Sequence, residues 1–190
     1  MYVDHFDFDL PLLWTVEGAL TPEECETLLH QAERGTWLDA TVNSAEGRVV
    51  QSHIRNNTLV VLDVPEWAAV LEARLEPHLP KVYKGGQWVC VGPKMRCYRY
   101  TAGQHFGLHR DQFYQGPMHH GHPLISRLTL MVYLNDDFDG GETDFPEQSQ
   151  VVVPRQGSAL LFQHMLLHEG KQVDRGTKYV LRTDVFYTSV

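Results

Sequence analysis

The chain has 190 residues, of which 43% are hydrophobic, and a formal net charge of −8 at pH 7. A chain of this length can bury a sizeable core, and it favours one domain over residues 1–190. The acidic balance disfavours a protein that must neutralise many phosphates, so nucleic acid is not an expected partner.

Cysteine usage and hydropathy indicate the compartment. The three cysteines, Cys25, Cys90 and Cys97, give neither a disulfide framework nor the Cys-x-x-Cys spacing of a zinc site. The segment Met1–Asp7 is acidic where a secretory signal is basic, and no apolar run is long enough to span a bilayer. We therefore expect a soluble, cytoplasmic protein with no membrane partner, of an oligomeric state that the sequence does not indicate.

The N-terminal part predicts a strand and then a helix. Leu12–Val16 has the composition of a first strand. Thr21–Glu24 then begins a helix, with Thr at the N-cap, Pro at the first helical position and Glu three residues after the cap. The helix should run to about Arg34, and apolar residues at helical spacing mark one buried face.

The next stretch completes a helical brace that we expect over about residues 20–80. Trp37–Val42 and Gly47–Gln51 are typical of short strands joined by a turn. A second helix should start near Asp63 or Pro65 and be closed by Pro77 and Pro80. Its predicted packing face is made of Trp67, Val70, Leu71, Arg74 and Leu75.

From residue 88 onward the pattern is that of strands separated by Gly, Pro and Asn turns. The predicted strands are Trp88–Val91, Lys94–Tyr100, Leu124–Leu134, Val151–Val153, Ala159–Phe162 and Lys178–Tyr187. Such a series indicates an antiparallel barrel or double sheet. The expected fold class is α+β, mainly β, with a barrel core over about residues 88–188 flanked by N-terminal helices.

His109, Asp111 and His168 are the candidate metal ligands. On an extended segment the side chains of His109 and Asp111 share a face and can bind one ion from the same side. Two imidazoles and one carboxylate form the ligand set that leaves three positions open on Fe(II). The His-x-Asp spacing alone is weak, because the chain has eleven histidines and His5-Phe6-Asp7 repeats it.

Four sequence blocks extend this pattern over about residues 98–187. They are Arg99-Tyr100 with Gly103-Gln104 and His109-x-Asp111; Arg127-Leu128-Thr129 with Tyr133-Leu134-Asn135; Gly140-Gly141-Glu142-Thr143 with Phe145-Pro146; and His168-Glu169-Gly170 with Val173, Gly176 and Lys178. In these blocks the chain resembles the prolyl 4-hydroxylase-like branch of the Fe(II)/2-oxoglutarate-dependent dioxygenases. The resemblance implies a double-stranded β-helix (jelly roll) with the metal at one open end.

The resemblance also implies a site for the co-substrate 2-oxoglutarate. Lys178 follows His168 at the interval where this branch places the lysine that binds the distal carboxylate, and Tyr100 matches the tyrosine that hydrogen-bonds it. Arg182 is the rival anchor, since other branches use an arginine. On one strand Lys178 and Arg182 share a face but lie roughly 13 Å apart, so one of them should reach the carboxylate. Thr129, by its parity, could offer a further contact, as could Asn135.

The remaining polar stretches receive simpler interpretations. Gly140–Thr143 predicts a tight turn with a polar cap. Gln112–Pro123, which carries His119, His120 and His122, predicts a long solvated loop that could close as a lid, and His164 predicts solvated surface. Arg55–Asn57 could line the entrance, and Arg127 could pair with substrate.

The predicted activity is therefore that of a 2-oxoglutarate-dependent dioxygenase that hydroxylates an unactivated aliphatic C–H bond. Its cofactors would be Fe(II), 2-oxoglutarate and dioxygen, with ascorbate as a further candidate. A prolyl residue in a peptide or protein is the favoured substrate. Alternatives are a free amino acid or small metabolite, and a non-catalytic metal-binding barrel. The sequence determines neither the substrate nor its stereochemistry.

Overall fold

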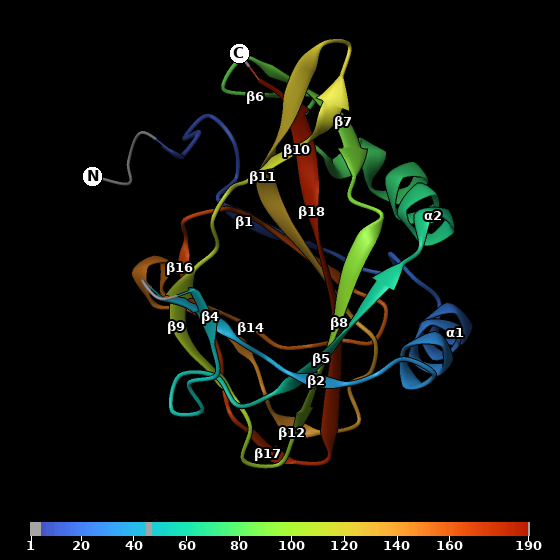
Figure 1. Cartoon of the computed structure of the whole chain (residues 1–190), viewed down its shortest axis with the longest axis vertical. Helices are drawn as coiled ribbons and strands as arrows, with labels where there is room; N and C mark the ends of the chain where they lie inside the picture. Colours follow the sequence, from blue (N-terminus) through green and yellow to red (C-terminus); the bar gives the residue numbers. More distant parts are fainter. Residues whose placement is uncertain (1–4, 45–46, 190) are drawn as a thin grey trace.

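The computed structural model describes residues 5–44 and 47–189, and there the chain forms two antiparallel β-sheets with two helices against the larger sheet (Figure 1). The larger sheet has the order β1 (Leu13–Val16), β15 (Ala159–Gln163), β11 (His122–Tyr133), β18 (Thr177–Thr188), β8 (Lys94–Thr101), β5 (Thr58–Asp63) and β2 (Leu38–Asp39). Three further strands extend it, β10 (Gln115–His119) beside β11, β7 (Gly86–Val91) beside β18 and β6 (Val82–Tyr83) beside β7.

The smaller sheet has the order β14 (Gln150–Val152), β13 (Thr143–Phe145), β16 (Leu167–Gly170) and β9 (Phe106–Arg110). Short pairs join β12 (Asp139–Gly140) to β17 (Val173–Arg175), and β3 (Val42–Ser44) to β4 (Gly47–Val49). Single 3-10 turns occur at η2 (Glu76–His78) and η3 (Pro146–Gln148). The mainly β prediction is confirmed, because strands dominate and the two sheets sandwich a common core.

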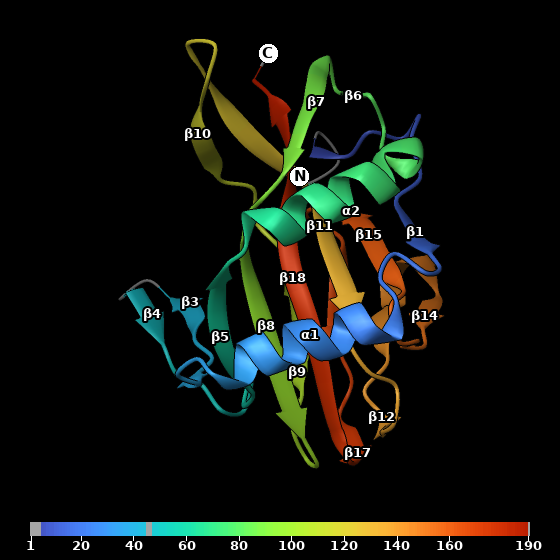
Figure 2. The same ribbon diagram turned by 90° about the vertical axis from the view of Figure 1, so that its right-hand side faces the viewer.

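Both helices lie on the same outer face of the larger sheet (Figure 2). Helix α1 spans Pro22–Glu33, and the predicted capping box is present: Thr21 Oγ1 accepts from the Glu24 amide, and the Glu24 carboxylate accepts from the Thr21 amide. Helix α2 spans Pro65–Leu75. Arg74 of α2 donates two hydrogen bonds to Glu24 of α1, at 2.6 and 2.8 Å, and so joins the helices.

Two apolar cores lie on opposite faces of the larger sheet. The first is between the helices and the sheet and contains Leu28, Leu71, Met95 and Leu181 with their neighbours. The second is between the two sheets and is mainly aromatic, containing Tyr98, Tyr100, Tyr133, Phe145 and Phe162 among others. The second core therefore borders the space between the two sheets, where polar side chains from both sheets can meet.

The structure corrects three local predictions. Helix α2 buries Ala68 with Leu71 and Leu75, whereas Trp67 and Val70 are only partly buried. The stretch Gln112–Pro123 is not one long loop, because β10 pairs with β11 as a hairpin. The strand expected over Trp37–Val42 is divided between β2 and β3, and residues 45–46 of the turn expected over residues 43–47 lie outside the described residues.

Within residues 5–44 and 47–189, no helix combines the length and the apolar character that crossing a bilayer requires.

Candidate active site

The three predicted metal ligands converge at the open edge between the sheets. His109 lies on β9 and His168 on β16, and these strands pair with the two histidines directly opposite each other. Asp111 comes directly after β9. One potential ligand atom from each of the three residues lies within 4.8 Å of the others, a spacing at which a single ion can be held. In the part of the chain that the structure describes, they form the one such cluster.

Hydrogen bonds fix how the two imidazoles point. Nδ1 of His109 is 2.9 Å from the Gly107 carbonyl, and Nδ1 of His168 is 3.0 Å from the Leu166 carbonyl. A carbonyl only accepts, so each Nδ1 carries the proton and each Nε2 keeps its lone pair. The Nε2 atoms lie 4.0 and 3.9 Å from the Asp111 carboxylate. This arrangement is the one in which histidine binds a metal.

Electrostatics favour the same protonation states. Burial lowers the pKa of His109 to about 3 and also lowers the pKa of His168, so both rings are neutral near pH 7. Burial opposes ionisation of Asp111, but the charge of Arg182 holds its pKa well below the usual range. The site therefore presents two neutral nitrogens and one carboxylate at neutral pH.

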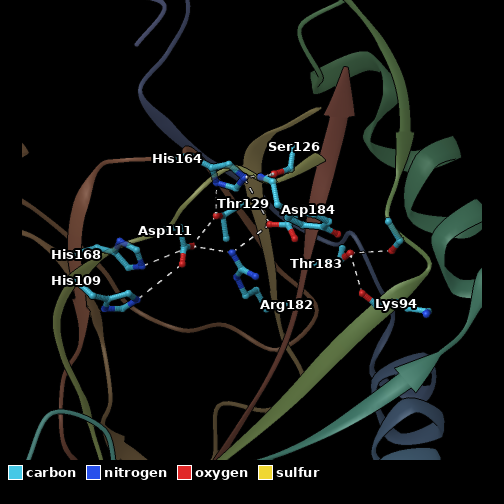
Figure 3. Close-up of polar contacts among 12 residues, drawn as sticks. Lys94, His109, Asp111, Ser126, Thr129, His164, His168, Arg182, Thr183 and Asp184 are labelled. Carbon is cyan, nitrogen blue, oxygen red and sulfur yellow. Dashed lines mark hydrogen bonds and ion pairs between the residues drawn. The ribbon is translucent and has the colours of Figure 1, made fainter. Parts of the chain in front are cut away.

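Thr129 and Arg182 contact the side of Asp111 that faces away from the histidines (Figure 3). Thr129 Oγ1 donates to Asp111 Oδ2 at 2.7 Å, and Arg182 Nη2 lies 3.1 Å from the same oxygen. Arg182 also pairs with Asp184 Oδ1 at 3.1 Å. No residue that the structure describes hydrogen-bonds to Asp111 Oδ1, so this oxygen remains available to a metal ion.

A directed series of hydrogen bonds continues behind Thr129. Because the Thr129 hydroxyl gives its proton to Asp111, its 2.9 Å contact with His164 Nδ1 requires that nitrogen to be the donor. His164 Nε2 then accepts from Ser126 Oγ at 3.1 Å, and Ser126 accepts from the Tyr114 amide at 3.0 Å. The series links the segment after Asp111 to the Asp111 carboxylate and restrains both.

A cavity of about 510 Å³ opens in front of the ligand cluster. Strand register explains its floor, because Arg96, Tyr98 and Tyr100 of β8 lie opposite Arg182, Val180 and Lys178 of β18, and all six line the cavity. Met131 of β11 lies opposite Arg182 and continues the row. Every second residue of a strand points to the same face of the sheet. Once the pairing of β8, β11 and β18 is known, these residues must therefore lie side by side on the cavity face.

Lys178 lies at the closed end of this row. Its side chain is 3% exposed, and Nζ donates to the Gly141 carbonyl at 2.6 Å. No carboxylate of the described residues pairs with it, and burial lowers its pKa to about 7. Gly141 adopts φ +71, and a Cβ there would meet Lys178 Cδ at 3.2 Å, so the double-glycine turn is what lets the backbone approach the ammonium.

Tyr100 and Thr129 complete the predicted co-substrate residues. Tyr100 is buried, lines the cavity, and holds its ring 5.5 Å from Lys178 Nζ. Burial raises the pKa of Tyr100 to about 12, so its hydroxyl keeps its proton and can donate. Thr129 is buried too, but it contacts Asp111 and not the part of the cavity near Lys178.

Several other predicted contacts are placed elsewhere. Asn135 donates to the Thr177 carbonyl and accepts from the Tyr179 amide, so it braces strand ends. Arg127 lies over the Tyr83 ring and does not line the main cavity. His164, expected on the surface, is buried among Ser126, Thr129 and Asp184. The histidines of the β10–β11 hairpin do not line the cavity, although Gln112, Phe113 and Tyr114 before the hairpin do.

Asp184 is a cavity-lining residue that the sequence did not single out. It has the parity of Lys178 and Arg182 on β18, so alternation alone could have placed it on the cavity face. The reason to select it, an ion pair with Arg182, depends on side-chain contacts.

The donor set fits an octahedral ion such as Fe(II), because two imidazoles and a carboxylate on one side leave the opposite positions free. The buried ammonium fits a diacid, because a cation without a carboxylate partner in the interior is stabilised by a bound anion. Both features lie on the same cavity.

Comparison with known proteins agrees with this chemistry. The sequence pattern of the 2OG-Fe(II) oxygenase superfamily matches residues 95–183. "Probable prolyl 4-hydroxylase 7" of Arabidopsis thaliana is 27% identical over 175 residues, covering 80% of this chain and 52% of the relative. "Prolyl 4-hydroxylase 1" of the same plant is 26% identical over 89% of this chain and 66% of the relative. The chain thus spans about half to two thirds of the length of these curated relatives.

Solved structures share the fold. A viral collagen prolyl hydroxylase from Paramecium Bursaria Chlorella virus-1, in a complex with 2OG, has a TM-score of 0.64 at 22% identity and covers 94% of this chain and 97% of its own. A prolyl hydroxylase from Trichoplax adhaerens has a TM-score of 0.68 at 16% identity, over 94% of this chain and 84% of its own. These likenesses extend the fold match beyond the barrel to most of the chain. Residues 95–183, the overall fold and the ligand cluster thus resemble those of prolyl 4-hydroxylase-like 2OG-Fe(II) oxygenases.

Proposed function

We propose that this chain is an Fe(II)- and 2-oxoglutarate-dependent dioxygenase that hydroxylates an unactivated aliphatic C–H bond, with a prolyl residue in a peptide or protein as its first candidate substrate. The observation that carries the proposal is a His-Asp-His cluster and a buried ammonium on one cavity. When bound, the iron and the keto acid supply dioxygen activation coupled to oxidative decarboxylation of the keto acid.

The metal would be held by Nε2 of His109, Nε2 of His168 and Oδ1 of Asp111. Their neutral and ionised states at pH 7 are the ones that bind a cation. Thr129 and Arg182 occupy Asp111 Oδ2 and keep the carboxylate from rotating. The remaining positions on the ion would face the cavity, where a keto acid and dioxygen can enter.

Lys178 would hold the distal carboxylate of 2-oxoglutarate, with the Tyr100 hydroxyl as a second donor. Arg182 is the poorer anchor, because its charge is already used by Asp111 and Asp184. The apolar residues Phe106, Met131 and Val180 line the same cavity and would limit the access of water to the bound co-substrate.

The proposal of a prolyl substrate is supported by the names of the relatives and by the shared fold. The curated relatives are named prolyl 4-hydroxylases, and the Trichoplax structure holds a peptide fragment of hypoxia inducible factor. A free amino acid or small metabolite is the second candidate, because a cavity of about 510 Å³ is of the size that small ligands occupy. We further propose that residues 1–190 act as one such domain.

The test is a screen of proline-containing peptides and free amino acids with Fe(II), 2-oxoglutarate and dioxygen. We expect a mass gain of one oxygen in the substrate together with succinate, and neither with His109→Ala. His105→Ala is the matched control, since His105 is a nearby half-buried histidine outside the ligand cluster.

Anaerobic titration separates the enzyme from a non-catalytic barrel. Fe(II) and 2-oxoglutarate together should give a weak visible charge-transfer band that His109→Ala abolishes. A band that is the same in both proteins would contradict the metal assignment. A parent protein that binds metal but not 2-oxoglutarate would favour the non-catalytic barrel.

A further inference from the structure

Arg55 is a buried cation on the wall of the active-site cavity, and no residue that the structure describes forms an ion pair with it. Its side chain is 7% exposed, and the guanidinium carbon lies 4.1 Å from the Phe106 ring centre and 4.5 Å from that of Tyr98. Nε donates to Asn57 Oδ1 at 2.8 Å. Nη2 is fully buried and has no hydrogen-bond partner among the described residues. The guanidinium is thus fixed in orientation, with a donor left over.

The position of Arg55 relates it to the metal site. Phe106 packs on Arg55 with one face, and its ring is also stacked on His109, with ring centres 3.5 Å apart and 16° between the planes. Arg55 therefore lies one aromatic layer from a metal ligand. Both residues line the same cavity. An anion bound to Arg55 would lie beside whatever is attached to the ion.

With iron and 2-oxoglutarate bound, the charged groups of the cavity would have a net positive charge. Arg182 is compensated by Asp111 and Asp184, and Arg110 pairs with Glu147. Iron(II), the dianionic keto acid, these two aspartates, Arg182 and Lys178 together sum to zero. Arg55 and Arg96 remain, and the half-buried side chain of Arg96 has neither ion pair nor hydrogen bond with a residue that the structure describes.

We propose that Arg55 binds a carboxylate of the prime substrate, so that the molecule hydroxylated is a carboxylic acid. This inference rests on the proposed function and narrows it. The guanidinium is planar and matches a carboxylate with two parallel hydrogen bonds, and Arg55 lines the cavity that the substrate would enter. Arg55 is a specificity-determining residue in this assignment. The carboxylate belongs either to a free amino acid or to a peptide in which it flanks the residue attacked.

Paired ligands test the proposal by direct binding. The protein is loaded with Mn(II) and 2-oxoglutarate without dioxygen, and calorimetry compares each acid with its primary amide: L-proline with L-prolinamide, and glycyl-L-proline with glycyl-L-prolinamide, in a panel extended to the common amino acids. We expect at least one acid to bind about tenfold or more tightly than its amide. If the acid binds more tightly than its amide only among the free amino acids, the substrate is a free amino acid. If the difference appears with the dipeptide, the substrate is a peptide.

Substitution assigns the preference to Arg55. Arg55→Met should abolish the difference between acid and amide while 2-oxoglutarate binds as before, and Arg55→Lys should keep part of it, because the charge remains without the planar fork. Arg99→Met is the matched control: Arg99 also stacks on an aromatic ring, 4.4 Å from the centre of Trp37, but does not line the cavity. That variant should keep the full preference.

Three results would overturn the proposal. They are an acid preference that survives in Arg55→Met, a panel in which no acid binds better than its amide, and a loss of 2-oxoglutarate binding in Arg55→Met, which would assign Arg55 to the co-substrate beside Tyr100. Thermal unfolding of the ligand-free variants checks the fold, since removing an uncompensated buried charge should not lower the melting temperature. Failure of the proposed function is distinguishable, because the parent protein would then bind no 2-oxoglutarate.

Discussion

The Asp111 carboxylate has more polar contacts than either histidine of the cluster. A threonine hydroxyl and an arginine hold one of its oxygens, and a buried histidine orients the threonine in turn. Contacts behind a ligand restrict its rotation, so that it meets the ion already aligned. At the scale of single residues the site is therefore ordered by groups that would never touch the metal.

Thr129→Val tests this ordering. Valine keeps the shape of threonine but removes the hydrogen bond to Asp111, so the affinity for Mn(II) should fall by about 10- to 100-fold. Equilibrium titration of the metal measures the change. Thr183→Val, a buried threonine on β18 that donates to the Gly92 carbonyl, is the control and should leave the affinity unchanged. Equal metal affinities in parent and Thr129→Val would show that the contact is only structural.

Lys178 gives a prediction about pH. Its pKa is lowered to about 7 by burial, so at pH 8 the free protein holds it mostly as the neutral amine. A bound diacid favours the ammonium, so binding at pH 8 should take up nearly one proton, and the affinity should fall about tenfold per pH unit above 7. Calorimetry of the Mn(II) protein in two buffers of different ionisation enthalpy measures the uptake.

Two lysine variants show whether the proton taken up on binding goes to Lys178. Lys178→Met should lose both the proton uptake and most of the affinity for 2-oxoglutarate. Lys171→Met removes a lysine that pairs with Asp144 outside the cavity, and it should keep both. If no proton were taken up by the parent at pH 8, Lys178 would not be the group that meets the distal carboxylate.

At the scale of elements, strand β18 supplies charged residues along the floor of the cavity. Lys178, Arg182 and Asp184 lie on its inward face, and β8 and β11 on either side add Tyr100 and Thr129. Of the candidate metal ligands, His109 and His168 lie on β9 and β16 of the smaller sheet, and Asp111 directly follows β9. The active site therefore depends on the packing of two sheets, and the helices contribute by holding the larger sheet in place.

The Glu24–Arg74 pair between the helices predicts how stability varies with pH. The side-chain hydrogen bonds from Arg74 and the backbone hydrogen bond at Thr21 lower the pKa of Glu24 from 4.5 to about 2. A carboxylate with a depressed folded pKa stabilises the fold above its unfolded pKa, and this contribution is lost as the pH falls towards the folded value. Glu24→Gln should therefore unfold at lower urea concentration at pH 7, and the gap from the parent should shrink between pH 4.5 and about 2.

The exposed Glu26 on the same helix is the matched control. Glu26→Gln removes the same charge without an ion pair, so it should hardly change the urea midpoint. A Glu24→Gln gap that stayed constant from pH 7 to 3 would mean that the variant acts through packing and not through the charge.

At the scale of the whole molecule, the larger sheet separates two apolar cores. One packs the helices against the sheet, and the other lies beside the candidate active site. The helices pack on one face with Leu28 and Leu71, while the aromatic core with Phe145 and Phe162 faces the ligand cluster. Phe162 contacts the His168 ring edge-on, at 4.6 Å between centres. The two cores should therefore respond differently to substitution.

Leu71→Ala tests this separation. Leu71 is fully buried between α2 and the sheet, and its truncation should lower the free energy of unfolding by about 2–5 kcal/mol. The affinity of the folded protein for Mn(II) should stay within about twofold of the parent, since sites without shared contacts act almost independently. Urea unfolding and metal titration of the same variant measure both. A large loss of metal affinity would show that the helices hold the site directly.

Local patterns in the sequence determined a good part of this protein. The capping box of α1 could be predicted because its contacts lie within four residues, and the sharing of one face by His109 and Asp111 follows from strand alternation. The tertiary structure alone decided that Lys178 and not Arg182 lacks a carboxylate, that His164 is buried, and that Arg55 keeps an unpaired donor. The physical reason is that these facts depend on the register and packing of segments far apart in the chain, which local spacing does not encode.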